Sequence, residues 1–223
     1  MKQINKICYA SYTMKRKHII TVSGKPGSGK SSTADKVAEL LGYTRYSSGD
    51  IVRQFLSRKK MTLEEYNQKA ADDHSLDARV DEELRDLRDK NDIIIDSRLG
   101  FYWIPESFKV YLDLDIELAT ARIFKDAVSN SGRSSVGTSN SSLDAVSRQV
   151  RNRMQNEQSR FRKMYGVDPY ATNHFDFIID TSRQNPQSVA IAVFDTYREW
   201  LDSDTWETRH HEVPIGYSLK NQY

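Results

Sequence analysis

The feature that most constrains this chain is a glycine-rich loop at residues 24–31 (GKPGSGKS), directly after a run of apolar and β-branched residues at 18–23 (HIITVS). The run predicts a buried strand. After the loop, apolar residues recur at helical spacing up to Leu41, and Gly42 is suited to end that helix. The backbone N–H groups of a G-x-x-x-x-G-K-[ST] loop between a strand and a helix can wrap a phosphate chain. This order therefore favours a phosphate-binding loop over a glycine-rich turn without a ligand.

The polar residues of the loop have expected roles. Lys30 would reach the outer phosphates of a nucleoside triphosphate, and the Ser31 hydroxyl would bind Mg²⁺. The residues expected to bind ATP here are Gly24, Lys25, Pro26, Gly27, Ser28, Gly29, Lys30, Ser31 and Ser32. GTPases, motor ATPases and small-molecule kinases share such a loop. No Asn-Lys-x-Asp guanine-reading motif follows it, and 223 residues are few for a motor with its own transducing domain.

Apolar runs at residues 92–96, 108–114 and 175–180 predict three further strands, and residues 44–47 (TRYS) predict another short one. Helical patterns occupy residues 50–58, 75–90, 116–128, 143–165 and 186–201, and Thr62 with Glu65 forms a capping-box pattern that opens another helix. Continuously apolar strands that alternate with helices indicate a parallel sheet covered on both faces. We therefore expect a three-layer α/β/α fold whose ligands bind at the carboxyl ends of the strands.

Two segments lack such patterns. Residues 129–142 are rich in serine and are expected to form a mobile loop. The tail at 204–223 shows no clear period, although Trp206 is one of the residues that could dock it. Within the tail, the adjacent His210 and His211 would point apart on a helix or strand and make a poor metal pair.

Composition excludes several other classes of protein. Lys and Arg total 33 against 31 for Asp and Glu, a net charge of +2, so bulk charge gives no signal for nucleic acid or membrane. Cys8 is the only cysteine, which excludes a disulfide within the chain and a cysteine metal site. No apolar run has membrane-spanning length, and the basic arm at 1–17 makes a poor signal peptide. We expect a cytoplasmic monomer whose partners are small nucleotides, without nucleic acid or membrane.

A second group of polar residues is expected at the same edge of the sheet. The segment SSGDIVR at 47–53 follows the second strand and places Ser48, Asp50 and Arg53 where a helix begins. An arginine there can hold a phosphate through two hydrogen bonds. Asp96 and Arg98 follow another strand, where Asp96 is suited to the Mg²⁺ shell and Arg98 to the same acceptor phosphate. The alternatives are a local i,i+3 ion pair between Asp50 and Arg53 and a surface position for Arg98.

The helix predicted at 143–165 is rich in arginine. Arg153, Glu157 and Arg160 are spaced four and three apart, so they lie on one face. Such a run usually indicates a solvated helix with salt bridges. Here it follows a loop that could act as a hinge, and phosphoryl transfer needs cations around the migrating group with water excluded. We therefore predict that this face closes over the phosphates.

Taken together, these motifs resemble those of one family. The chain is similar to cytidylate kinases, specifically to the short archaeal-type (d)CMP kinases among the P-loop nucleoside monophosphate kinases. The stretches that carry the resemblance are ITVSGKPGSGKSS, LGYTRYSSGDIVR, MTLEEYNQKAADD, IIIDSRLG, RNRMQNEQSRFRKMYGVD and FDFIIDTSR. They span about residues 18–200. The glycine loop is generic, whereas the combination of SGDIVR, DSRLG and the R-x-x-x-E-x-x-R run is much more specific.

The resemblance implies an organisation and further roles. It implies a kinase domain at 18–203, with a monophosphate-binding helical insert at about 50–90 and a small lid at about 126–158, flanked by the arm and the tail. It implies that Arg53 and Arg98 bind the acceptor's phosphate and that Arg122 lies near the ATP base. It also implies that Arg153, Glu157 and Arg160 contact the acceptor and the transferring phosphate, with Glu157 positioned for the acceptor's sugar. The chain departs from the family in carrying Asp126 where its members often have a second basic residue.

The predicted reaction is ATP + (d)CMP ⇌ ADP + (d)CDP with Mg²⁺. The predicted catalytic residues are Lys30, Arg153 and Arg160, the metal-holding residues are Ser31 and Asp96, and the monophosphate-binding residues are Ser48, Asp50, Arg53, Arg98, Arg153, Glu157 and Arg160. One alternative is a kinase for another small acceptor, such as AMP, UMP or a metabolite. The other is a regulatory module that binds ATP without using it, and the arginines on the acceptor side argue against that alternative.

Overall fold

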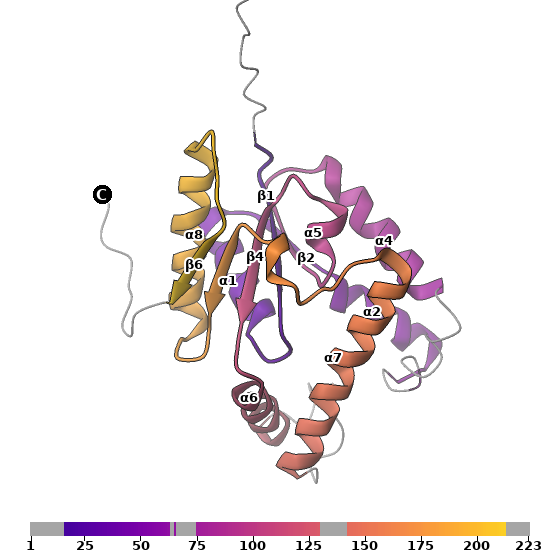
Figure 1. The fold of residues 1–223 in the computed structure, drawn as a ribbon. Coiled ribbons are helices and arrows are strands. Elements are labelled where there is room, and N and C mark those ends of the chain that lie inside the picture. The colour runs from indigo at the N-terminus through magenta and orange to yellow at the C-terminus, as the bar shows by residue number, and fades with distance from the viewer. Residues whose placement is uncertain (1–15, 63–64, 66–74, 130–141, 213–223) are drawn as a thin grey trace, which may run out of the picture.

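The computed structural model describes residues 16–62, 65, 75–129 and 142–212. Within these residues the strands form a single parallel sheet in the order β2-β3-β1-β4-β5-β6 (Figure 1). The strands are β1 (Ile19–Gly24), β2 (Thr44–Ser47), β3 (Ile93–Asp96), β4 (Phe108–Asp113), β5 (Phe177–Asp180) and β6 (Arg209–Glu212). β1 lies between β3 and β4, so the glycine loop that follows it leaves from the middle of the sheet.

Helices connect the strands. They are α1 (Lys30–Leu41), α2 (Ser48–Lys59), α4 (Ser75–Asp86), α5 (Gly100–Trp103), α6 (Ile116–Ser129), α7 (Leu143–Tyr165) and α8 (Pro186–Asp202), with short 3₁₀ turns η1 (Leu87–Asp89) and η2 (Thr172–His174). Polar N-caps begin several of them. Ser47, Ser142 and Asn185 each accept a hydrogen bond from the backbone N–H three residues on. Gly42 and Gly166 end α1 and α7 in the left-handed conformation.

Side chains on the two faces of the sheet enter separate cores. Ile20 and Val22 of β1 are fully buried in a core that includes residues of α1 and α8, whereas Ile19 packs in a core with Leu84 of α4. A third core on the sheet includes Phe161 of α7 and Tyr111 of β4. Because successive strand residues point to opposite faces, a strand covered on both sides must be apolar throughout. This explains the continuous apolar runs and confirms the expected three-layer α/β/α fold.

The expected strands and helices are present with small shifts at their ends. α7 has the expected bounds, whereas the helix expected at 75–90 ends as α4 at Asp86 and continues as the turn η1. The capping box is also present: Glu65 N donates to Thr62 Oγ1 over 3.1 Å, and Thr62 N donates to Glu65 Oε2 over 2.7 Å. Residues 66–74, over which that helix would continue, and most of the serine-rich segment lie outside the described residues.

The tail showed no clear period in the sequence, yet part of it, Arg209–Glu212, is a strand. This segment forms β6, parallel to β5 at the edge of the sheet. Trp206 anchors it, because its ring lies 6.1 Å from that of Phe108 and its Nε1 donates to the carbonyl oxygen of Asp176 over 3.1 Å. The segment RHHE contains no apolar residue, so its pairing with β5 left no periodicity in the sequence. The short helix α5 was not predicted either.

The long helix α7 contacts helices at both of its ends. It runs from beside α6 toward α2 and α4 (Figure 1), and it is tied to α4 by contacts of Asp77 and Asp81 with Arg160 and Tyr165. Among the described helices, none is long and apolar enough to cross a membrane.

Candidate active site

The loop after β1 has a backbone shape that requires glycine. Gly24 has a φ of 145°, and a Cβ atom there would lie 2.3 Å from the carbonyl oxygen of Leu112 in β4. Gly29, the N-cap of α1, is left-handed with a φ of 84°. A side chain at either position would be strained. The glycines thus let the chain turn tightly against β4 and deliver the positive N-terminal end of α1 to the edge of the sheet.

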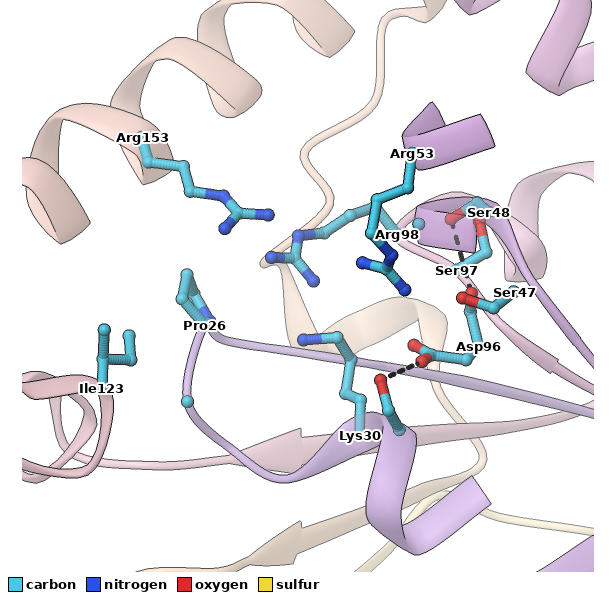
Figure 2. Close-up of a pocket in the computed structure, with 13 residues that line it drawn as sticks. Pro26, Lys30, Ser47, Ser48, Arg53, Asp96, Ser97, Arg98, Ile123 and Arg153 are labelled. Atoms are coloured by element: carbon cyan, nitrogen blue, oxygen red, sulfur yellow. Dashed lines mark hydrogen bonds between the residues drawn. The ribbon is translucent and has the colours of Figure 1, made fainter. Parts of the chain in front are cut away.

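A cleft of about 230 Å³ opens above this loop. It is lined by Pro26, Gly27, Lys30, Ser31, Ser47, Ser48, Gly49, Arg53, Asp96, Ser97, Arg98, Ile123 and Arg153. Figure 2 shows the charged ends of Lys30, Arg53, Arg98 and Arg153 turned toward the same space, although they come from α1, α2, the β3–α5 loop and α7. Four cations around one cleft favour an anionic ligand with more than one phosphate group.

Lys30 occupies the floor of this cleft. Its Nζ donates to the carbonyl oxygens of Gly24 and Lys25, each over 3.1 Å. Burial lowers the pKa of Lys30 well below its ordinary value, and the nearby Arg98 lowers it further. The charged form of Lys30 is therefore costly without an anion beside it. Phosphate oxygens in the cleft would stabilise the ammonium group and favour its protonation.

Ser31 and Asp96 place a hydroxyl and a carboxylate in contact beside Lys30. Ser31 Oγ donates to Asp96 Oδ2 over 2.6 Å, and the Asp96 side chain is 7% exposed (Figure 2). Arg45 Nη2 also donates to Asp96 Oδ2, over 3.1 Å. Hydroxyl and carboxylate oxygens are the ligands that Mg²⁺ prefers, usually with waters and substrate phosphates completing its shell. The residues present therefore fit an Mg²⁺ ion that enters with a nucleotide.

Glu157 organises two of the cleft arginines. Its carboxylate accepts from Arg98 Nε over 2.7 Å, from Arg153 Nε over 2.9 Å, and from the Tyr170 hydroxyl. Burial alone would raise the pKa of Glu157, but Arg98 and Arg153 outweigh it and hold the pKa well below its usual range. The same pairing raises the pKa of Arg98 despite its burial. Both arginines are held through Nε, and their guanidinium groups face the cleft (Figure 2). Arg98 Nη1 also donates to the carbonyl oxygen of Gly24 over 3.2 Å.

The structure brings together about half of the predicted site residues. Those that line the cleft are Pro26, Gly27, Lys30, Ser31, Ser48, Arg53, Asp96, Arg98 and Arg153. Those that do not line it are Gly24, Lys25, Ser28, Gly29, Ser32, Asp50, Arg122, Glu157 and Arg160. Asp50 instead pairs with Arg53, the local ion pair considered above, and this pairing does not remove Arg53 from the cleft.

Three basic residues outside the cleft have other partners. Lys25 pairs with Asp113 over 2.7 Å at the end of β4. Arg160 Nε lies 3.5 Å from Asp77 Oδ2 of α4, so this helix-to-helix pair holds it here. Arg122 donates to the carbonyl oxygens of Thr181 and Ser182 over 2.6 and 3.2 Å, in the loop between β5 and α8.

Sequence reasoning missed several residues of the site. Ser47, Gly49, Ser97 and Ile123 line the cleft. The first three lie within or beside the SSGD and DSR motifs, so those motifs could have indicated them. Tyr170 and Arg45 contact Glu157 and Asp96, but neither lies in a motif with a recognised chemical role. Only the folded structure reveals them.

A parallel sheet with a phosphate loop in its middle and cations on both sides of the cleft places the chain among the P-loop kinases. Solved structures agree on the fold. A shikimate kinase from Acinetobacter baumannii in complex with shikimate superposes with a TM-score of 0.53 at 15% identity, covering 83% of this chain and 95% of the other. A shikimate kinase from Bacteroides thetaiotaomicron reaches 0.55 at 10% identity, covering 83% and 98%. At such identities the likeness shows the fold alone.

The chain belongs to the cytidylate kinase-like family, whose model matches residues 19–183. A cytidylate kinase from Natronomonas pharaonis is 29% identical over 189 residues, covering 83% of this chain and 92% of that protein. One from Desulfurococcus amylolyticus is 32% identical over 165 residues, covering 73% and 83%. One from Halobacterium salinarum is 29% identical over 199 residues, covering 88% and 94%. The resemblance seen in the motifs is therefore confirmed at the level of the family.

Proposed function

We propose that this enzyme transfers the γ-phosphoryl group of ATP to CMP or dCMP, forming ADP and CDP or dCDP. The observation that carries this proposal is the division of the cleft. Lys30 and the glycine loop form its floor, and above them Arg53 of α2 and Arg153 of α7 face the cleft from opposite sides, with Arg98 between them (Figure 2). A donor triphosphate and an acceptor monophosphate would each find cations there. The relatives named cytidylate kinase support cytidine as the acceptor nucleoside.

The chemistry needs little from acid–base groups. The attacking oxygen belongs to a phosphate monoester that is already ionised, so no strong general base is required. Catalysis would consist of positioning the two phosphates in line and stabilising the charge that spreads over the transferring group. Lys30 and Arg153 are suited to the transferring group, and Arg53 and Arg98 to the acceptor phosphate. Glu157 would hold Arg98 and Arg153 in place during the reaction.

Mg²⁺ is part of the proposal as the ion that accompanies ATP. When bound, it neutralises phosphate charge and orients the β- and γ-phosphates. Ser31 would hold it directly, and Asp96 would hold it directly or through water. Asp96 also accepts from Ser31, and this contact keeps the Ser31 oxygen at the mouth of the loop.

Three assignments remain proposals that depend on movement or on contacts with substrate. Arg122 is proposed to lie near the ATP base, beside the loop after β5 that it contacts. Arg160 is proposed to reach the phosphates, for which it must exchange Asp77 for phosphate oxygens. Three donors already occupy the Glu157 carboxylate, so its proposed contact with the acceptor's sugar uses the acceptor capacity left on its oxygens.

An acceptor panel tests the proposal. The full chain would be incubated with ATP and Mg²⁺ and with CMP, dCMP, UMP, AMP or no acceptor, while ADP release is measured. We expect kcat/KM for CMP or dCMP to exceed that for AMP and UMP by at least tenfold. Lys30→Ala should lower kcat by about a thousandfold with an unchanged thermal melt, which corresponds to about 4 kcal/mol of transition-state stabilisation. Preference for another acceptor would overturn the assignment of the base, and ATP binding without acceptor-stimulated ADP release would favour the regulatory module.

The remaining expectations belong to the same proposal. We propose the domain limits given above, with the insert and the lid as separate moving parts. We also propose a monomer that acts in the cytoplasm on small nucleotides, without nucleic acid or membrane. Sedimentation of the full chain with and without nucleotide would test the oligomeric state.

A further inference from the structure

Arg45 lies at the end of the sheet between three acidic residues. It belongs to β2, and its side chain is 20% exposed. Its Nε lies 3.2 Å from Asp35 of α1, its Nη1 lies 3.6 Å from Asp50 of α2, and its Nη2 lies 3.1 Å from Asp96 of β3. One guanidinium group thus connects three elements. A planar fork of donors is suited to such bridging, whereas the single ammonium group of a lysine is not.

Two of these carboxylates contact residues on opposite sides of the cleft. Asp96 accepts from Ser31, the proposed Mg²⁺ ligand on the donor side. Asp50 pairs with Arg53, the proposed ligand of the acceptor phosphate. The third carboxylate, Asp35, is 61% exposed on α1 and lines neither side. A continuous line of polar contacts therefore runs Ser31–Asp96–Arg45–Asp50–Arg53.

We propose that Arg45 is a positioning residue that couples the donor side to the acceptor side, so that a nucleotide bound with Mg²⁺ strengthens binding of the monophosphate. This inference rests on the proposed function. The coupling follows from competition for shared charges. An Asp96 carboxylate drawn toward a cation at Ser31 shares less of its charge with Arg45. Arg45 then interacts more strongly with Asp50, and Asp50 holds Arg53 less tightly. The Arg53 guanidinium, 65% exposed, becomes available to the acceptor phosphate.

The coupling can be measured without catalysis, because ADP and CMP together do not react. The affinity of the full chain for CMP would be measured by calorimetry with saturating ADP, once with Mg²⁺ and once with EDTA. The coupling factor is the ratio of the two dissociation constants for CMP. Linkage requires that CMP raise the affinity of the protein–ADP complex for Mg²⁺ by the same factor. We expect a factor of about five or more for the wild-type protein, at the lower end of the usual range.

Arg45→Lys and Arg45→Met remove the bridge in different ways. Lysine keeps the charge but does not reach Asp96 and Asp50 with two donors at once. Both variants should lower the coupling factor to within twofold of one. Asp35→Asn is the matched control, because it removes a carboxylate from Arg45 and leaves the line between Asp96 and Asp50 intact. It should keep the wild-type factor. Thermal melts would show whether each variant is folded. If Arg45→Met does not fold, the result for Arg45→Lys alone decides the test.

The outcomes separate this inference from the proposed function. A wild-type protein that phosphorylates CMP but shows no coupling would overturn the inference alone. So would a wild-type coupling factor in Arg45→Lys, or an equal loss in Asp35→Asn, which would make Arg45 a general clamp at the edge of the sheet. If the wild-type protein neither binds nor phosphorylates CMP, the proposed function fails first, and this inference fails with it.

Discussion

Replacing Glu157 by glutamine would test whether one carboxylate organises the site. Glu157 accepts charge-assisted hydrogen bonds from Arg98 over 2.7 Å and from Arg153 over 2.9 Å. Such bonds contribute about 1.5–3 kcal/mol each. Glutamine keeps one acceptor oxygen but turns an N–H₂ group toward one of the arginines. Because Arg153 is 37% exposed, we take the lower end of this energy range, about 1.5 kcal/mol, for each of the two bonds. The free energy of unfolding should therefore fall by about 3 kcal/mol.

That loss should be visible by calorimetry or circular dichroism. For a chain of this size, 1 kcal/mol shifts Tm by about 2–4 °C, so Glu157→Gln should lower Tm by about 6–12 °C. Glu117→Gln is the matched control, because Glu117 also pairs with an arginine of α7, Arg151, but is 67% exposed. It should change Tm by less than about 4 °C, since exposed pairs contribute roughly 0–1 kcal/mol. A Tm shift in Glu157→Gln no larger than in this control would refute the reasoning.

The pH dependence provides a second test of Glu157. Its pKa in the folded protein lies below its usual range, so its contribution is present above the unfolded pKa of about 4.3 and is lost as pH falls through the folded pKa. The stability difference between the wild-type protein and Glu157→Gln should therefore be constant from neutral pH to about 4.3 and shrink only below it.

The variant should also lose roughly 10- to 100-fold in kcat/KM for CMP, because two phosphate-binding arginines lose their orientation. Unchanged kinetics would mean that Glu157 is only a structural contact.

Two further predictions test the role of Arg53 in binding the acceptor and the role of Trp206 in the stability of the sheet edge. Arg53→Ala should raise KM for the monophosphate by roughly tenfold or more while KM for ATP changes less than twofold, because Arg53 lines the cleft opposite the phosphate loop. A change confined to the ATP constant in steady-state kinetics would show that the acceptor side is misplaced. Trp206→Ala should cost about 2 kcal/mol, since this half-buried ring anchors β6 beside Phe108, and should lower Tm by about 4–8 °C. Its kcat at 25 °C should be near that of the wild-type protein because β4 and β5 separate β6 from the phosphate loop, and a large loss of kcat without a change in Tm would contradict this account.

The roles of some candidate site residues could be predicted from local sequence patterns, and those of others could not. Lys30 and Ser31 could be assigned because their motif recurs with one local geometry, and that geometry is present here. Arg53, Asp96 and Arg98 could be assigned because polar residues at strand ends meet at one edge of a parallel sheet. Arg160 shows the limit of this reasoning: it shares a helical face with Arg153, yet its guanidinium pairs with Asp77 of α4. Spacing along a helix defines a face, but the partner of that face depends on how the helices pack.

The sequence alone determined the parallel fold, the phosphate loop and the likeness to cytidylate kinases. These depend on local rules. Glycine occupies strained backbone positions, apolar residues recur with the period of a strand or a helix, and some short motifs have a single chemical role. Only the tertiary structure decided that Glu157 holds two arginines with Tyr170, that Arg45 joins Asp96 to Asp50, and that Arg209–Glu212 pairs with β5. The physical reason is common to all three. Each depends on at least one contact between segments distant in the chain, namely Arg98 with Glu157, Arg45 with Asp96, and β5 with β6. Charge and hydrogen bonding act there across space and leave no period in the sequence.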